Sequence, residues 1–159
     1  MQDDASAEER LSTHLPVYSL QAAAGYLAAG HEIEVEGWVD ISSVQRHLDD
    51  SMFVSQVVGR SMEDQIPDGS FCVFRRIAAG TRPGKVVLAQ HRDITDPDTG
   101  GSRTVRRYAS AKQPSEEGII GTIELRPDNP DFETIVLTPV TEDEVLVLAE
   151  LVAVLGVEA

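Results

Sequence analysis

Short apolar runs with a two-residue period, each ended by a turn, constrain the fold of this chain most. Residues 32–39 alternate acidic with apolar side chains, which is typical of a strand with one face in water and the other on a core. Similar runs recur at 52–58, 71–74, 85–90, 104–108, 119–125, 134–137 and 145–157, with Pro-, Asp-, Asn- or Gly-rich turns at 67–69, 83–84, 97–101 and 127–130. The pattern predicts an all-β domain of short, mostly antiparallel twisted sheets.

Two segments are compatible with either of two conformations. The run 145–157 contains good helix formers, but its five valines and Gly156 favour a strand. In the small-residue run 21–25, the alanines favour a helix. Pro16 before them and Gly25 at their end are equally compatible with an exposed extended or turn segment.

Length and composition indicate one domain. The 159 residues suffice for a single core, and the charged stretch at the start lacks apolar periodicity. We therefore expect a flexible, disordered tail over 1–14 and a domain over 15–159. With no apolar run near the roughly 18 residues of a membrane span and no signal-peptide pattern, we expect a cytoplasmic protein that does not contact a membrane.

The charge balance and the sparse cysteines and histidines exclude several functions. There are 27 acidic and 13 basic residues, a net charge of −14, so we expect no direct DNA binding by this chain. The single cysteine, Cys72, lies in an apolar run and is expected in the core. The sequence contains neither a Cys/His metal motif nor a phosphate-binding or dinucleotide-binding motif, so we expect no metal and no cofactor.

The most specific motif is centred on Ser61-Met62. A strand ends at Gly59, the serine and methionine follow, and an Asp68-Gly69 turn closes the segment. This pattern resembles the peptidase domain of the LexA, UmuD and phage-repressor family of self-cleaving serine-lysine peptidases, in which Gly-x-Ser-Met precedes Ile-x-Asp-Gly. Further similarity lies at 84–89, 104–108, 124–132 and 152–156, so the resemblance covers about residues 17 to 157.

The resemblance implies the residues of a catalytic site. Ser61 takes the position of the nucleophile, and Ala24-Gly25 matches the peptide bond that the family cleaves in its own chain, within a self-cleavage segment near 22–30. Ala29-Gly30 offers a second, similar bond. Small residues suit such a site because they let the backbone approach the serine closely.

The sequence departs from the family at the general base. Arg106 stands where the family has a lysine, in Thr-Val-Arg-Arg-Tyr against Thr-Val-Lys-Arg-Leu. A serine needs a base to remove its proton, and a lysine serves when burial lowers its pKa, whereas a guanidinium keeps its proton. The sequence therefore predicts slow or no self-cleavage. Other candidate bases are poor: Lys85 begins a strand, Lys112 lies in a polar loop, and His91 is expected at the surface.

Several interpretations remain open at this stage. Three explanations account for an arginine at position 106. The chain is a natural pseudo-peptidase, or a normally active protein carries an inactivating Lys-to-Arg change, or another residue serves as the base. The resemblance implies a homodimer and a stress-response or phage-related switch that responds to a RecA-like co-protease. We expect this chain to stand alone without a helix-turn-helix DNA-binding domain, and in that respect it looks more like UmuD than like a repressor. The alternative is a catalytically inactive binding module for a partner protein, and a third possibility is cleavage of other chains in trans.

Overall fold

The computed structural model describes residues 10–11, 13–30, 32–44, 47–63, 65–77, 84–92, 94–95, 101–115, 118–137 and 146–157. The expected tail falls mostly outside this part of the chain, although His14 already belongs to the first strand and Arg10 bridges to it. No helix among these residues is long and apolar enough to cross a membrane.

The described strands form one sheet, with the order β2-β1-β3-β4-β9-β5-β6-β7-β8. Every pair is antiparallel except β1 and β3, which meet in parallel at Val17 and Val54. The predicted all-β, mostly antiparallel fold is thus confirmed. The strands are β1 His14–Val17, β2 Gly37–Asp40, β3 Met52–Val57, β4 Ser70–Arg76, β5 Val86–Gln90, β6 Arg103–Ser115, β7 Gly118–Arg126, β8 Ile135–Leu137 and β9 Leu146–Gly156.

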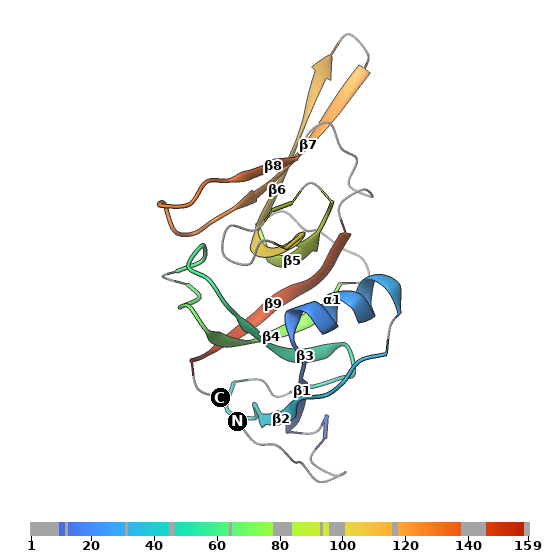
Figure 1. Ribbon diagram of the computed structural model, residues 1–159, viewed down its shortest axis with the longest axis vertical. Coiled ribbons are helices and arrows are strands. Elements are labelled where there is room, and N and C mark those ends of the chain that lie inside the picture. The colour runs from blue at the N-terminus through green and yellow to red at the C-terminus, as the bar shows by residue number, and fades with distance from the viewer. Residues whose placement is uncertain are drawn as a thin grey trace.

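Strand β9 joins the two halves of the sheet. It pairs with β4 on one side and with β5 on the other, and both ladders contain a register shift (Figure 1). The preference for a strand over 145–157 was therefore correct. Neighbours on both edges explain its nearly continuous run of apolar residues.

The alanine-rich segment forms the helix α1, Leu20–Ala29, which lies against β3 and β9 (Figure 1). The side chain of Ser19 accepts a hydrogen bond from the Ala22 N–H at 3.1 Å and so caps the first turn. Gly30, with a φ of 69°, ends the helix in the left-handed conformation that favours glycine. Of the two conformations that the sequence allowed, the helical one is present because a cap stands at each end.

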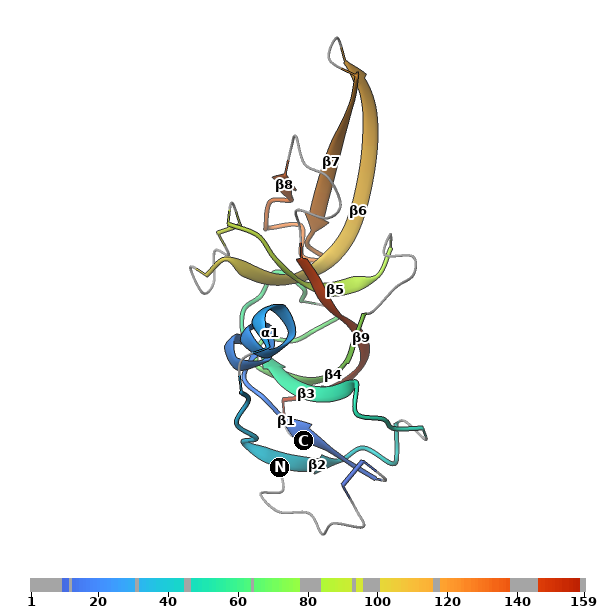
Figure 2. The ribbon, with the colours of Figure 1, turned by 90° about the vertical axis from the view of Figure 1, so that its right-hand side faces the viewer.

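Two strand predictions were wrong in extent. Residues 32–36 are not in a strand, and Val35 is 40% exposed, because their neighbour β1 has only four residues and ends at Val17. Conversely, β6 continues well beyond the predicted run 104–108 and pairs with β7 in a long hairpin that projects from the sheet (Figure 2), whereas β7 lies close to its predicted bounds of 119–125. Lys112 therefore lies within β6 and not in a loop. The sequence did not predict this extension because its residues are largely polar and do not alternate with apolar ones.

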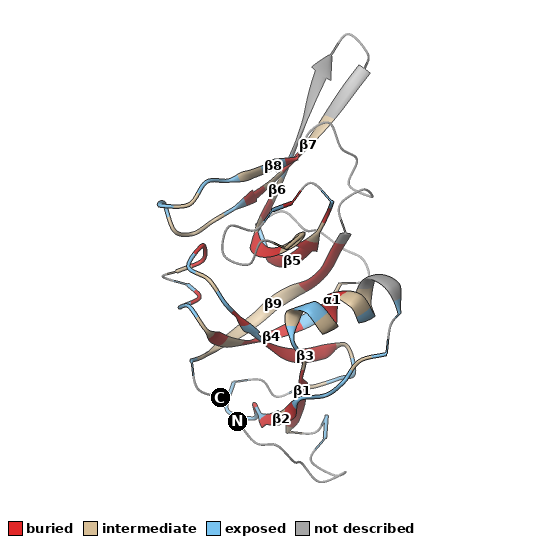
Figure 3. Ribbon diagram, viewed as in Figure 1, coloured by how far each residue is buried: buried red, intermediate tan, exposed pale blue. Residues whose placement is uncertain are grey.

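Three clusters of buried residues form the core. Figure 3 shows that β3, β4 and β5 are largely buried, whereas most of β9 is partly buried. The first cluster lies beneath α1 and includes Ala23, Ala24, Met62, Cys72 and Val105. It thus connects the helix to the motif around Ser61 and to β6. Cys72 is fully buried, as expected.

Candidate functional site

A closed loop between β3 and β4 carries Ser61. Gly59 and Gly69 adopt φ values of 118° and 83°, which side chains other than glycine rarely adopt. The Gly59 N–H donates to Oδ1 of Asp68 at 2.8 Å, and the Gly69 N–H donates to the Val57 carbonyl at 2.9 Å. The motif residues therefore close the loop at its base.

A tight turn within this loop presents the serine. The Glu63 N–H donates to the Arg60 carbonyl at 3.2 Å, and the Ile66 N–H donates to the Met62 carbonyl at 2.7 Å. Met62 is buried in the first cluster, whereas Ser61 is 8% exposed. The methionine thus anchors the turn in the core and leaves the serine at the edge of a cleft.

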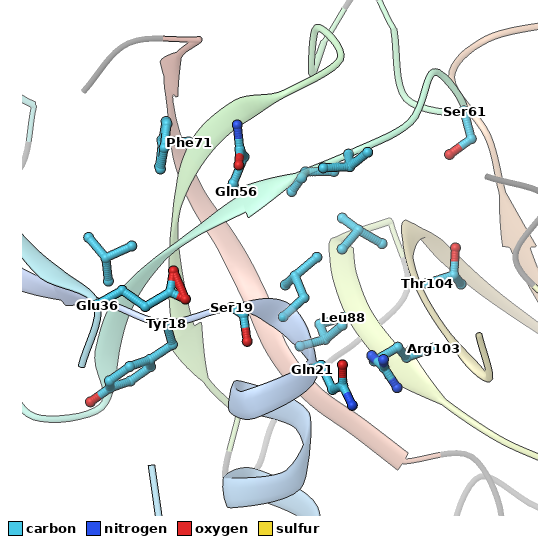
Figure 4. Close-up of a pocket in the computed structure, with 15 residues that line it drawn as sticks. Tyr18, Ser19, Gln21, Glu36, Gln56, Ser61, Phe71, Leu88, Arg103 and Thr104 are labelled. Atoms are coloured by element: carbon cyan, nitrogen blue, oxygen red, sulfur yellow. The ribbon is translucent and has the colours of Figure 1, made fainter. Parts of the chain in front are cut away.

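The cleft has a volume of about 560 Å³, within the range of ligand sites. Ser61 lies at one end of it, and Tyr18 and Glu36 lie toward the other (Figure 4). Its walls come from the start of α1, the end of β3 and the β5–β6 pair, with Leu20, Gln21, Val57, Leu88, Thr104 and Val105 among the lining residues. The helix that contains Ala24-Gly25 therefore begins at the same cleft as Ser61.

The loop 127–133 packs against the Ser61 turn. The Asn129 N–H donates to the Ser61 carbonyl at 3.0 Å, and Nδ2 of Asn129 donates to the Arg60 carbonyl at 2.9 Å. One residue earlier, Asp128 pairs with Arg107. The sequence identified this segment only by family resemblance, and its contact with the serine was missed because the two segments are 69 positions apart.

Arg106 is buried in β6, with an exposed fraction of 1%. Its Nη1 donates to the Glu133 carbonyl at 2.6 Å, so it holds the same loop that contacts the Ser61 turn. Residues two apart in a strand point the same way, so Arg106 projects to the side of Thr104, which lines the cleft. Arg106 itself is not among the described lining residues. A guanidinium in this position stays charged and is not a proton acceptor.

The Ala24-Gly25 bond lies inside α1. Ala24 is buried in the cluster that holds Met62, and the Gly25 carbonyl accepts a hydrogen bond from the Gly30 N–H. The bond is therefore close to the core beneath the cleft, but it is held in a helical conformation. Ala29-Gly30, the second candidate bond, lies at the opposite end of the helix from the cleft.

Comparison with known proteins identifies the domain. The sequence model of the Peptidase S24-like family matches residues 16–152. The chain belongs to the Peptidase S24-like family. A LexA repressor from Polaromonas sp. (strain JS666 / ATCC BAA-500) is 32% identical over 126 residues, which cover 79% of this chain and 45% of the repressor. The chain thus spans less than half the length of this relative, and the similarity supports a LexA/UmuD-type serine peptidase domain.

Two of the other candidate bases in this S24-like domain, Lys85 and His91, are not among the residues that line the described cleft. Nζ of Lys85 pairs with Oε2 of Glu150 at 2.9 Å. His91 is buried, so its expected position at the surface was wrong; it follows β5, and its backbone N–H donates to the Ser102 carbonyl. The side chain of Lys112 is outside the described part of the structure.

The described part of the S24-like domain holds no group of three or more His, Cys, Asp or Glu residues arranged to bind a metal ion.

Proposed function

We propose that this chain is a LexA/UmuD-like self-cleaving serine peptidase domain with Ser61 as nucleophile and Ala24-Gly25 as the scissile bond. We further propose that Arg106, in place of a lysine base, makes this cleavage slow or absent. The observation that carries the proposal is the shared cleft: Ser61 lies at one end of it, and the first residues of the helix that contains Ala24-Gly25 form part of its wall.

The proposed reaction is an acyl transfer within the chain. The Ser61 hydroxyl attacks the carbonyl carbon of Ala24, its proton passes to a base, and backbone N–H groups stabilise the oxyanion. The bond between Ala24 and Gly25 then breaks, and the amine of Gly25 gains a proton. Water hydrolyses the resulting ester and releases Ser61. With a permanently protonated residue at 106, the first proton transfer lacks an acceptor there.

Cleavage also requires α1 to unwind, because a peptide bond inside a hydrogen-bonded helix cannot lie extended beside the serine. An isolated helix of about ten residues is marginal in water, so packing on the sheet supplies most of the stability of α1. Leu20, Ala23, Ala24 and Leu27 provide this packing. The burial of these side chains therefore determines the free-energy cost of unwinding α1.

The direct test is to restore a base. We expect Arg106→Lys to cleave itself into fragments 1–24 and 25–159 at least about 100-fold faster than the parent chain, the lower range of a general base. The rate should rise with pH because a buried lysine must lose its proton to act. Mass spectrometry over pH 7 to 10 measures both fragments. Arg106→Lys combined with Ser61→Ala is the matched control and should stay intact.

Two results would contradict the proposal. The first is a folded Arg106→Lys chain that stays intact, as judged by an unchanged circular-dichroism spectrum. The second is spontaneous fragmentation of the parent chain at Ala24, which would show that the arginine does not block the reaction.

We extend the proposal to a homodimer in the cytoplasm that serves a stress-response or phage-related switch, with a RecA-like co-protease as activator. The family resemblance supports this extension. A RecA filament added to the Arg106→Lys chain should accelerate cleavage, and analytical ultracentrifugation should give twice the mass of one chain. A monomeric chain whose rate of self-cleavage is unchanged by the filament would refute both the homodimer and the co-protease.

A second function is a catalytically inactive binding module, which presents the same cleft to a partner protein. The buried contact between Arg106 and the Glu133 carbonyl favours it, because this contact gives the arginine a structural role. On this hypothesis, Ser61→Ala leaves partner binding unchanged while a bulky residue at Thr104 abolishes it. The two functions differ in whether Arg106→Lys gains cleavage.

A further inference from the structure

Asn129 contacts two consecutive peptide groups of the turn that carries Ser61. Its backbone N–H donates to the Ser61 carbonyl at 3.0 Å, and its side-chain Nδ2 donates to the Arg60 carbonyl at 2.9 Å. Both carbonyls therefore point toward one residue. This fixes the rotation of the peptide planes on either side of the serine.

The opposite edges of these planes carry two N–H groups. In a trans peptide group the N–H points away from the carbonyl, so the N–H groups of Ser61 and Met62 point away from Asn129. Among the described residues, neither of these two N–H groups donates a hydrogen bond. Two adjacent donors beside a serine hydroxyl have the arrangement that stabilises an oxyanion.

Asn129 is itself fixed in place. Its Oδ1 accepts the Asp131 N–H at 3.0 Å, which orients the side-chain amide so that Nδ2 faces Arg60. Beside it, Arg107 donates to both carboxylate oxygens of Asp128, at 3.3 and 3.2 Å, and to Oε1 of Gln65 at 2.6 Å. Since Gln65 follows Ser61 in the same loop, Arg107 ties the 127–133 loop to the far side of the turn.

We propose that Asn129 is a positioning residue that aims the N–H groups of Ser61 and Met62 at the oxyanion formed from the Ala24 carbonyl, with the Arg107–Asp128 pair holding it in register. The inference rests on the proposed self-cleavage. As the bond from Ser61 Oγ to the Ala24 carbonyl carbon forms, the carbonyl π electrons move to the carbonyl oxygen, and the two N–H groups donate hydrogen bonds to this oxyanion. The carbonyl double bond forms again when the bond to Gly25 breaks.

The test compares Asn129 variants in the Arg106→Lys chain. Asn129→Asp keeps the acceptor for the Asp131 N–H but has no donor for the Arg60 carbonyl, and Asn129→Ala loses the donor without adding charge. Both should lower the first-order rate of self-cleavage about 10- to 100-fold, because a small misplacement of donors is costly. Thr134→Ala, an exposed position in the segment after this loop, is the control and should keep the parental rate.

Two further readouts separate positioning from loss of stability. The midpoint of the pH–rate profile should stay unchanged while its plateau falls. Labelling of Ser61 by a fluorophosphonate probe should slow by a similar factor, because the phosphonylated serine uses the same N–H groups while α1 stays wound. Weakened packing alone would ease the unwinding of α1 and would not slow the labelling.

The outcomes distinguish the two proposals. If Arg106→Lys cleaves itself and the Asn129 variants keep its rates of cleavage and labelling, the role of Asn129 is refuted and the proposed function stands. If a folded Arg106→Lys chain neither cleaves itself nor reacts with the probe, the proposed function fails and the role of Asn129 fails with it.

Discussion

The Ser61 turn and the helix α1 border the same cleft but are held in place by different forces. Polar contacts and one buried side chain fix the turn: Asp68 of the same loop holds its base, Asn129 from a distant segment holds the two carbonyls around the serine, and Met62 anchors the turn in the core. The helix is held by the apolar side chains of alanines and leucines and by a cap at each end. The candidate nucleophile is therefore preorganised, whereas the candidate scissile bond lies in a segment of low intrinsic stability.

The difference suggests a division of roles. Hydrogen bonds have strict geometry, so a web of them suits a group that must stay within a fraction of an ångström. The alanines of α1 bury little area, and its leucines Leu20 and Leu27 are only partly buried, so α1 can leave the sheet at a modest cost in free energy. Each of the following substitutions should either increase or decrease the difference in stability between the Ser61 turn and α1.

The largest expected effect is on the turn. Met62→Ala removes a fully buried side chain from the first cluster and should lower the free energy of unfolding by about 2–5 kcal/mol. Urea denaturation followed by circular dichroism measures it. A loss below about 1 kcal/mol would mean that the polar contacts alone hold the turn.

A smaller effect is expected at the ends of α1. Ser19→Ala removes the N-terminal cap and should cost about 1 kcal/mol. Gly30→Ala places a side chain at a φ of 69° with nothing within 4 Å of the added carbon, so backbone strain alone should cost about 1–2 kcal/mol. In the Arg106→Lys chain, both variants should also cleave faster, as measured by mass spectrometry. Slower cleavage would mean that the helix does not need to open.

A substitution inside the helix should stabilise α1, in contrast to the loss of its caps. Gly25→Ala should stabilise α1 by about 0.5–1 kcal/mol, because glycine is a poor residue in a helix interior. Thermal denaturation should show a higher midpoint, and cleavage of the Arg106→Lys chain should slow. Because this change also alters the bond itself, Ala22→Gly is the matched control, with the opposite sign expected for both measurements.

Cys72 lies in the core beneath both regions. Burial raises the pKa of its thiol to about 12. The native protein should therefore not react with Ellman's reagent at pH 8, whereas the urea-unfolded chain should react fully. Because the folded pKa lies above the unfolded value, the thiol contributes stability below about pH 9 that is lost as the pH rises toward 12. Cys72→Ala should flatten that alkaline loss.

Much of the fold could be predicted from local pattern. Alternating residues and turn residues located the strands other than β1, and the valines of 145–157 correctly favoured a strand over a helix. The prediction failed where pairing and not pattern decides. Residues 32–36 alternate but have no partner strand, while the β6–β7 hairpin continues through polar residues because its two strands pair with each other.

The site was predictable only in part. Ser61 was identified from its motif, and the structure places it at the cleft. The contacts of Asn129 and Arg107 with its turn join segments that are 69 and 42 positions apart, and no local periodicity encodes such contacts. The burial of His91 was missed for the same reason, since packing around a loop depends on distant segments.

The central place of β9 has a consequence for biosynthesis. One wall of the cleft comes from α1, β3 and the Ser61 loop, and the other comes from β5 and β6. Strand β9 lies between these halves in the sheet and is synthesised after every other described strand. A nascent chain that lacks residues 146–156 thus lacks the strand that pairs with both halves, although Arg107 and Asn129 still contact the Ser61 loop. Any cleft chemistry is therefore postponed until residues 146–156 have been synthesised and paired.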